Sequence, residues 1–234
     1  MKRIGVLSSG GDTPGMNAAI RAVVKVAAEY GIEVFGIRHG YRGLIEGDMR
    51  ELTTDEVRNI AHKGGTILKT ARCKEFMVEE GQRRALLTAQ AFDLEGIIAI
   101  GGDGTMQGAG ALSKMGIPTI TLPGTIDNDL AYTDFSIGFD TAVNGVLTEL
   151  IKVRDTMVSH DRIGIVEVMG NKCGDIALHA GVAGSADFIL LPEMEFDIDV
   201  ICDQLIKNNI RNRKTSMIVL AEGAGKAEPM AEII

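Results

Sequence analysis

Residues 3–28, RIGVLSSGGDTPGMNAAIRAVVKVAA, contain the pattern that decides the fold. The first part, Arg3–Leu7, is typical of a short β-strand. A glycine-rich loop follows over residues 8–15, and apolar side chains then recur at helical spacing. A strand, a glycine loop and a helix in this order predict one βα unit of an open parallel sheet.

The same alternation continues along the chain. Further strands are expected at Ile32–Ile37, Gly96–Ile100, Pro118–Leu122, Ile163–Val168, Phe188–Leu191 and Ser216–Ala221. Helices are expected at Thr53–Ala61, Glu79–Phe92, Gly102–Met115, 139–159, Asp175–Gly184 and 198–206. The repeated βα order predicts α/β domains with mainly parallel sheets, each covered by helices on both faces. A loop-rich stretch gives way to a long helix near Gly138, which predicts a division into domains 1–138 and 139–234.

The composition excludes several classes of protein. The 234 residues are 45% hydrophobic and 24% charged, as expected for a chain that buries a core. The net charge of −8 disfavours nucleic-acid binding. No apolar run approaches the 18 residues of a membrane span. Three cysteines (Cys73, Cys173 and Cys202) without C-x-x-C spacing indicate a reducing, cytoplasmic setting rather than a disulfide scaffold or zinc site.

Two glycine loops follow predicted strands and precede predicted helices, at Ser8–Gly15 and at Gly101–Thr105. Each offers free backbone N–H groups at a helix N-terminus, where phosphate is favoured. An acid beside bound phosphate needs a cation between them, so Asp103 is a candidate Mg²⁺ ligand. A pair of tight turns without a ligand is the alternative, and two such loops, each with an Asp, disfavour it.

Two other nucleotide motifs do not fit. A Walker A motif ending at Gly225 and Lys226 would need glycine at Leu220 and a hydroxyl residue at Ala227. A G-x-G-x-x-G motif would need glycine at Gln107.

The segment PGTIDND, residues 123–129, places Thr125, Asp127 and Asp129 at alternate positions. Phosphoryl transfer needs a carboxylate to accept the proton of the attacking hydroxyl. A second Asp to orient the first, and a Thr to hold the transferring phosphate, would complete such a site. Taken alone, a solvated turn is the better interpretation. Beside the glycine loops we favour catalysis.

The segments GGDTPGMNAAIR, GGTILKTAR, GGDGT, PGTIDND and EVMGNKCGDIAL closely resemble bacterial ATP-dependent 6-phosphofructokinases, over the whole chain. GGDGT alone is weak, since NAD kinases and lipid kinases carry a similar run, but PGTIDND together with GGDxPGMNA is specific. The resemblance implies the phosphofructokinase fold of two Rossmann-like, three-layer α/β/α domains. It also implies transfer of the ATP γ-phosphate to the 1-hydroxyl of fructose 6-phosphate in glycolysis.

By resemblance, the catalytic residues are Asp127 as general base, Thr125 at the transferring phosphoryl group and Asp129 in support. The residues implied to hold ATP, with Asp103 on Mg²⁺, are Gly11, Arg72, Cys73, Gly102, Asp103, Gly104 and Thr105. The residues implied to bind fructose 6-phosphate are Thr125, Ile126, Asp127, Arg162, Met169, Gly170, Asn171 and Glu222. Arg162 is expected to reach a neighbouring subunit's site, which implies a homotetramer.

Three positions distinguish this chain within the resemblance. Pyrophosphate-using relatives typically carry Asp at Gly104 and Lys at Gly124, so the two glycines favour ATP. Asn171 stands where the family usually has Arg. An Arg there would help to neutralise the transferring phosphate, and we expect Asn171→Arg to raise activity.

A phosphorylated effector is also implied. Arg21 and Lys25 lie four apart on the first helix, in a stripe with Asn17 and Glu29 that we expect to be exposed. Matching family positions form an inter-subunit effector pocket, here Arg21, Lys25, Arg154, Ser185, Asp187, Arg211, Arg213 and Lys214. The resemblance predicts activation by ADP and inhibition by phosphoenolpyruvate, although Thr54 replaces an Arg of some members.

Two alternatives stay open. A GGDGT-type kinase acting on NAD or a lipid is one, and PGTIDND disfavours it. Family members also continue past Ile234, so the resemblance predicts an incomplete second domain. A non-catalytic nucleotide-binding fragment is therefore the other alternative.

Overall fold

The computed structural model describes residues 2–234, which divide into two compact α/β units. The first unit runs to Thr125 and includes Leu130–Gly138. The second unit comprises Ile126–Asp129 and Phe139–Ile234.

The first unit is built on a six-stranded sheet of order β3-β2-β1-β4-β5-β6. Its strands are β1 Arg3–Ser8, β2 Glu33–Ile37, β3 Met49–Glu51, β4 Gly96–Gly101, β5 Thr119–Thr125 and β6 Ile137–Gly138. Only β3 runs antiparallel to its neighbour. Its helices are α1 Met16–Glu29, α2 Tyr41–Glu46, the 3-10 turn η1 Glu75–Met77, α3 Glu79–Ala91 and α4 Asp103–Lys114.

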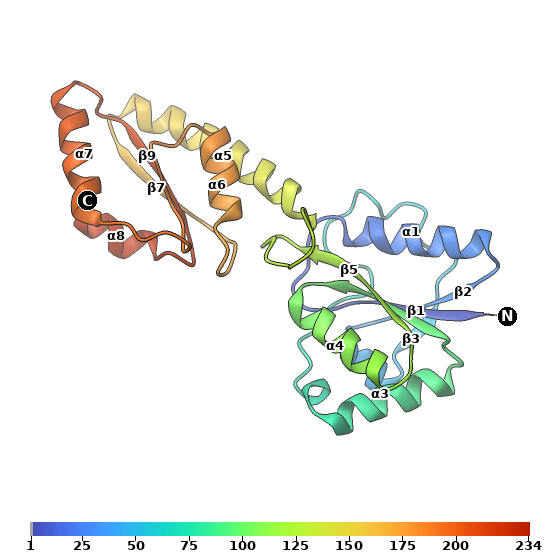
Figure 1. The fold of residues 1–234 in the computed structure, drawn as a ribbon. Coiled ribbons are helices and arrows are strands. Elements are labelled where there is room, and N and C mark those ends of the chain that lie inside the picture. Colours follow the sequence, from blue (N-terminus) through green and yellow to red (C-terminus); the bar gives the residue numbers. More distant parts are fainter. Residues whose placement is uncertain (1) are drawn as a thin grey trace. The chain divides into compact units, whose positions relative to one another are not determined.

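Consecutive residues of β1 point to opposite faces of this sheet and start two separate cores. Val6 packs in one cluster with Met16 and Ile20 of α1. Leu7 packs in the other with Ala89 of α3 and Leu112 of α4. Figure 1 shows α1 on one side of the sheet and α3 and α4 on the other, a three-layer arrangement.

The second unit repeats the three-layer design on a smaller, fully parallel sheet of order β7-β9-β8. Its elements are α5 Phe139–Ser159, β7 Ile163–Val168, α6 Asp175–Ala183, β8 Phe188–Leu190, α7 Ile198–Ile210, β9 Ser216–Ala221 and α8 Ala227–Ile233. The central strand β9 is buried along its whole length. Met217 and Val219 face the helices α5 and α6, while Ile218 and Leu220 face α7 and α8. The sequence-based expectation of parallel α/β sheets covered on both faces is confirmed.

The expected helix at Thr53–Ala61 is wrong, since this stretch forms turns. A capping pair does form, because Thr53 N donates to the Glu56 carboxylate at 2.9 Å and Glu56 N donates to Thr53 Oγ1 at 3.4 Å. Helical spacing of apolar residues is also present, and Val57 and Ile60 are buried in the α1 core. These two side chains are thus buried by successive turns and not by a helix, because tertiary packing outweighs local helix propensity.

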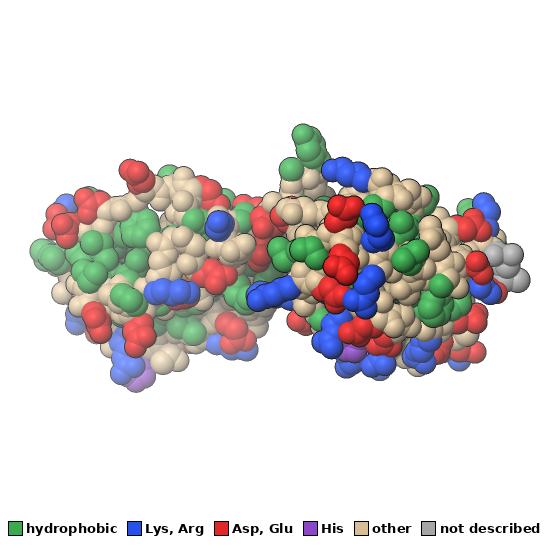
Figure 2. Space-filling model, turned by 90° about the horizontal axis from the view of Figure 1, so that it is seen from below, with side chains coloured by type: hydrophobic (Ala, Val, Ile, Leu, Met, Phe, Trp, Pro, Cys, Tyr) green, Lys and Arg blue, Asp and Glu red, His purple; other side chains and the backbone are tan. Residues whose placement is uncertain are grey.

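The surface carries charges of both signs. On the face seen in Figure 2, Lys and Arg side chains are interspersed with Asp and Glu and form no continuous basic surface. Among residues 2–234, no helix combines the length and the hydropathy needed to cross a bilayer.

Candidate active site

Three neighbouring parallel strands of the first unit end at one edge of its sheet. Ser8 of β1 is in register with Ile100 of β4, and Gly101 of β4 is in register with Pro123 of β5. The two glycine loops and Thr125 therefore lie side by side at the carboxyl edge, where open α/β sheets bind ligands.

Direct contacts hold the two glycine loops together. Ser9 N donates to the Ile100 carbonyl at 3.0 Å, and the Thr105 hydroxyl donates to the Ser9 carbonyl at 3.0 Å. Thr105 is only 3% exposed, so its hydroxyl fixes the loop from within. A side chain at Gly101 would clash with the Ser9 carbonyl and with Thr105, so this close approach requires glycine.

Tyr41 supports the second glycine loop through a buried hydrogen bond. Its buried hydroxyl donates to the Thr105 carbonyl at 2.5 Å, and burial raises the pKa of Tyr41. Its ring stacks on Phe76 with centroids 4.1 Å apart. No sequence pattern indicated either aromatic residue, because they lie outside every glycine motif and only the tertiary fold brings them to α4.

The N-terminus of α4 is open to solvent. Asp103 and Gly104 form its first turn and are exposed. Asp103 Oδ2 accepts a hydrogen bond from Gln107 Nε2 at 2.7 Å, which orients the carboxylate along the helix. A Cβ built on Gly104 meets no heavy atom within 4 Å. The first turn thus offers backbone N–H groups and a helix dipole to an incoming phosphate, and one carboxylate to a cation that accompanies it.

Arg72 and Cys73 are carried to this edge by a long segment without helix or strand. Two residues before Arg72, the Thr70 hydroxyl donates to the Gly10 carbonyl at 2.6 Å. Because two residues span at most about 7 Å, Arg72 lies near the first glycine loop and Gly11. Its side chain is exposed.

The acidic turn joins the two units in sequence. Thr125 ends β5, and Asp127, two residues later, belongs to the second unit. Covalent geometry alone keeps their Cα atoms within about 7 Å. Partial burial raises the pKa of Asp127, and the nearby carboxylates of Asp129 and Glu222 raise it further. A carboxylate with a raised pKa is suited to accept a proton near neutral pH.

In the second unit, the turn after β7 is held by Glu222, which follows β9. Glu222 Oε1 accepts hydrogen bonds from Gly170 N at 3.1 Å and Asn171 N at 2.8 Å. Asn171 has a left-handed φ of 56°, and Gly170 has a φ of 144° that favours glycine. The turn leaves the Met169 side chain exposed. The structure thus brings Met169, Gly170, Asn171 and Glu222 together.

Arg162 lies elsewhere. It precedes β7 and is exposed, whereas Met169 follows β7. The six residues of β7 span about 20 Å and lie between Arg162 and Met169. Within one chain, Arg162 is therefore not part of the cluster around Glu222.

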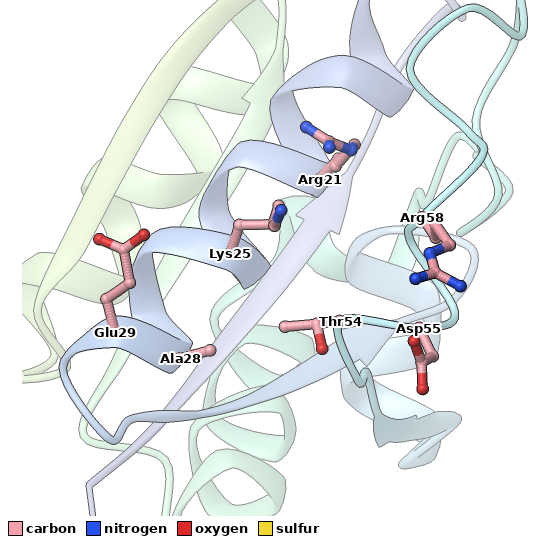
Figure 3. A pocket seen from close by; sticks show the side chains of 7 residues that line it. All are labelled: Arg21, Lys25, Ala28, Glu29, Thr54, Asp55 and Arg58. Carbon is pink, nitrogen blue, oxygen red and sulfur yellow. The ribbon is translucent and has the colours of Figure 1, made fainter.

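Part of the predicted effector set lines a pocket of about 390 Å³ in the first unit (Figure 3). Arg21 and Lys25 of α1 face it together with Arg58, which the sequence analysis missed because its stretch was expected to be helical. The other lining residues are Ala28, Glu29, Thr54 and Asp55. The expectation that Asn17 is exposed on this stripe is wrong, because it is 1% exposed and hydrogen-bonded inside the unit.

The remaining effector candidates belong to the second unit. Arg154 donates to the Ser185 carbonyl at 2.6 Å, and Asp187 accepts from Met217 N at 2.8 Å. The others, Arg211, Arg213 and Lys214, follow α7, and Lys214 pairs with Asp161 at 3.3 Å.

Glycine loops at helix N-termini, at the carboxyl edge of a parallel sheet and followed in the chain by a carboxylate turn, define a class. They are the arrangement of an α/β phosphotransferase.

Comparison with known proteins identifies the family. The phosphofructokinase family model matches residues 3–234. The chain is 53% identical over 234 residues to an ATP-dependent 6-phosphofructokinase of Clostridium botulinum, and covers 73% of that protein. A solved phosphofructokinase of Saccharomyces cerevisiae is 32% identical with a TM-score of 0.91, over 99% of this chain and 36% of that chain. A solved pyrophosphate-dependent phosphofructokinase of Marinobacter aquaeolei is 25% identical with a TM-score of 0.87. That match covers 100% of this chain and 64% of the other chain. The chain belongs to the phosphofructokinase family.

Proposed function

We propose that the chain is an ATP-dependent 6-phosphofructokinase, which transfers the γ-phosphate of ATP to the 1-hydroxyl of fructose 6-phosphate. The 53% identity to a relative of that name supports the reaction. The observation that carries the mechanism is Asp127, whose pKa is raised by burial and by two neighbouring carboxylates, two residues after Thr125 at the carboxyl edge.

MgATP would bind at the carboxyl edge of the first unit. The first turn of α4 would receive phosphate oxygens through backbone N–H groups, with Gly104 leaving room for them. Gly11 and the segment Arg72–Cys73 would hold the nucleotide from the neighbouring loop. No group of three metal-binding side chains occurs in residues 2–234. Mg²⁺ takes one or two carboxylates and completes its shell with water and nucleotide phosphates.

Asp103 is the carboxylate that fits this ion, since it is exposed at the helix N-terminus and already oriented by Gln107. When bound, Mg²⁺ neutralises charge that develops on the phosphate oxygens. We assign ATP as the phosphate donor because residues 104 and 124 are both glycine, and not the Asp and Lys typical of pyrophosphate-using relatives.

The sugar phosphate would bind in the second unit. Asp127 would take the proton of the 1-hydroxyl as that oxygen attacks the γ-phosphorus, and ADP would leave with the electrons of the broken P–O bond. Thr125 would hold the transferring phosphoryl group, and Asp129 and Glu222 would keep the pKa of Asp127 high. Ile126, Met169, Gly170, Asn171 and Glu222 would complete the sugar contacts.

The position of Arg162, at the far end of β7 from Met169, is understandable if it serves a neighbouring subunit. This supports the homotetramer that the resemblance implies. The three cysteines without C-x-x-C spacing favour the cytoplasm as its location. The pocket of Arg21, Lys25 and Arg58 would receive the phosphates of ADP or phosphoenolpyruvate, since three cations there face only Glu29 and Asp55. Arg58 would supply the charge that Thr54 lacks.

The proposed function is tested by a coupled assay for fructose 1,6-bisphosphate with MgATP and fructose 6-phosphate. Asp127→Ser is expected to lower kcat by roughly 10²–10⁴, the range of general-base catalysis. A loss confined to KM would make Asp127 a binding residue instead. Phosphorylation of NAD or a lipid in preference to the sugar would reject the proposal.

A further inference from the structure

Asn17 is the most thoroughly hydrogen-bonded polar side chain of α1, although it lies one turn before the pocket residue Arg21. Its amide Nδ2 donates to the Lys63 carbonyl at 3.0 Å and to the Gly64 carbonyl at 3.2 Å. Its Oδ1 accepts from Ile67 N at 2.8 Å. One buried side chain thus holds three backbone groups of a single loop. These hydrogen bonds do not involve the side chains of that loop.

That loop belongs to a segment, residues 53–73, that has no helix or strand between β3 and η1. Within it, backbone hydrogen bonds form only in isolated turns, such as Lys63 N to the Ile60 carbonyl and Lys69 N to the Thr66 carbonyl, so its other buried polar groups need outside partners. One end of segment 53–73 contributes Thr54, Asp55 and Arg58 to the pocket. The other end carries Arg72 and Cys73.

Between these ends, segment 53–73 is laid against the first glycine loop. The Ser8 and Thr66 hydroxyls are 2.7 Å apart, and Ser8 Oγ donates to the Lys69 carbonyl at 3.2 Å. Thr70 then donates to the Gly10 carbonyl at 2.6 Å. Thr66 lies among the residues held by Asn17, and Lys69 and Thr70 follow them directly, so a shift of residues 63–67 would move Thr70, and with it Arg72, along the loop.

We propose that Asn17 is a positioning residue for nucleotide binding, which acts by fixing segment 53–73 so that Arg72 lies beside the glycine loop. The inference rests on the proposed MgATP site of the first unit. It assigns to Asn17 no contact with the nucleotide itself.

Two variants separate positioning from folding. Asn17→Ala removes all three hydrogen bonds. Thr70→Val removes only the hydroxyl that joins segment 53–73 to Gly10, at nearly constant volume. The matched control is Leu94→Ala, a buried residue of the opposite core cluster that takes no part in the hydrogen bonds described above.

The experiment measures the Kd for MgATP by calorimetry, the Tm, and amide hydrogen exchange of residues 67–70 for each chain. We expect Asn17→Ala to raise the Kd about tenfold, or about 1.4 kcal/mol, and to lose exchange protection in this stretch. Thr70→Val is expected to shift both in the same direction by a smaller factor. Leu94→Ala should lower the Tm at least as much as Asn17→Ala and leave the Kd within twofold.

A Kd within twofold of the unmodified chain in both Asn17→Ala and Thr70→Val would overturn the inference and leave the proposed function intact. The same conclusion follows if Leu94→Ala weakens binding as much as Asn17→Ala. If Asn17→Ala does not fold, Thr70→Val alone decides by the same criterion. Absence of MgATP binding by the unmodified chain would overturn the proposed function together with the inference.

Discussion

Replacement of Gly104 by Asp tests where the phosphates of ATP bind. Gly104 lies in the first turn of α4, and a Cβ built there meets no heavy atom within 4 Å. The carboxylate would therefore enter the space that we assign to phosphate, without a clash. Because a first-turn acid is favoured by the helix dipole and glycine is a poor helix former, the Tm should not fall.

The size of the effect follows from the charge. Two unit charges about 4 Å apart repel by about 4 kcal/mol at an effective dielectric constant of about 20. Residue 104 is exposed, so we halve this value to about 2 kcal/mol, which corresponds to an approximately thirtyfold higher Kd for MgATP.

Titration calorimetry of MgATP into the unmodified chain, Gly104→Asp and Gly104→Ala measures this loss. The Ala variant is the control, since it adds a Cβ in open space without charge and should bind within twofold. A Gly104→Asp chain that keeps its Tm and binds MgATP within threefold would refute the assignment of phosphate to the N-terminus of α4.

Three further predictions concern the residues around the proposed site. Tyr41→Phe should lower stability by about 0.5–1.5 kcal/mol and weaken MgATP binding, because it removes the side-chain donor to the Thr105 carbonyl; urea unfolding and calorimetry measure the two effects. Asp127→Asn should raise the Tm at pH 7, because the raised pKa of Asp127 means that its ionised form destabilises the fold. The stability that Asp127 contributes is complete below its unfolded pKa of about 3.9 and is lost as pH rises through the folded pKa. The Tm difference between Asp127→Asn and the unmodified chain should therefore vanish near pH 4. A Tm gain that persists at that pH would contradict the inference that folding raises the pKa of Asp127. Asn171→Arg should raise kcat/KM for fructose 6-phosphate. It should also lower the free energy of unfolding by about 1 kcal/mol, since Arg must adopt a φ of 56°. An unchanged or lower kcat/KM would contradict the claim that a cation at residue 171 assists transfer.

The sequence predicted best where function depends on local order. Strand, glycine loop and helix follow one another in the chain, so the open N-terminus of α4 and the loop after β1 could be located from residues alone. The neighbouring position of these loops follows from parallel strand order, which the βα repeat implies.

Prediction failed where contacts are distant in sequence. Asn17 has the spacing of an exposed helical residue, and only the path of residues 63–67 across α1 buries it. The capping pair of Thr53 and Glu56 starts a turn that the chain does not continue as a helix. Arg58 was consequently missed, and Tyr41 was missed because its hydrogen bond spans 64 residues.

The central claim is the transfer of phosphate from ATP to fructose 6-phosphate. ³¹P NMR of the chain with fructose 6-phosphate, and either MgATP or magnesium pyrophosphate, follows donor and product in one experiment. We predict that a new C1 phosphate monoester and ADP appear with MgATP, and that pyrophosphate supports little or no product. Product formed faster from pyrophosphate than from ATP, or ATP consumed without a sugar bisphosphate, would contradict the account.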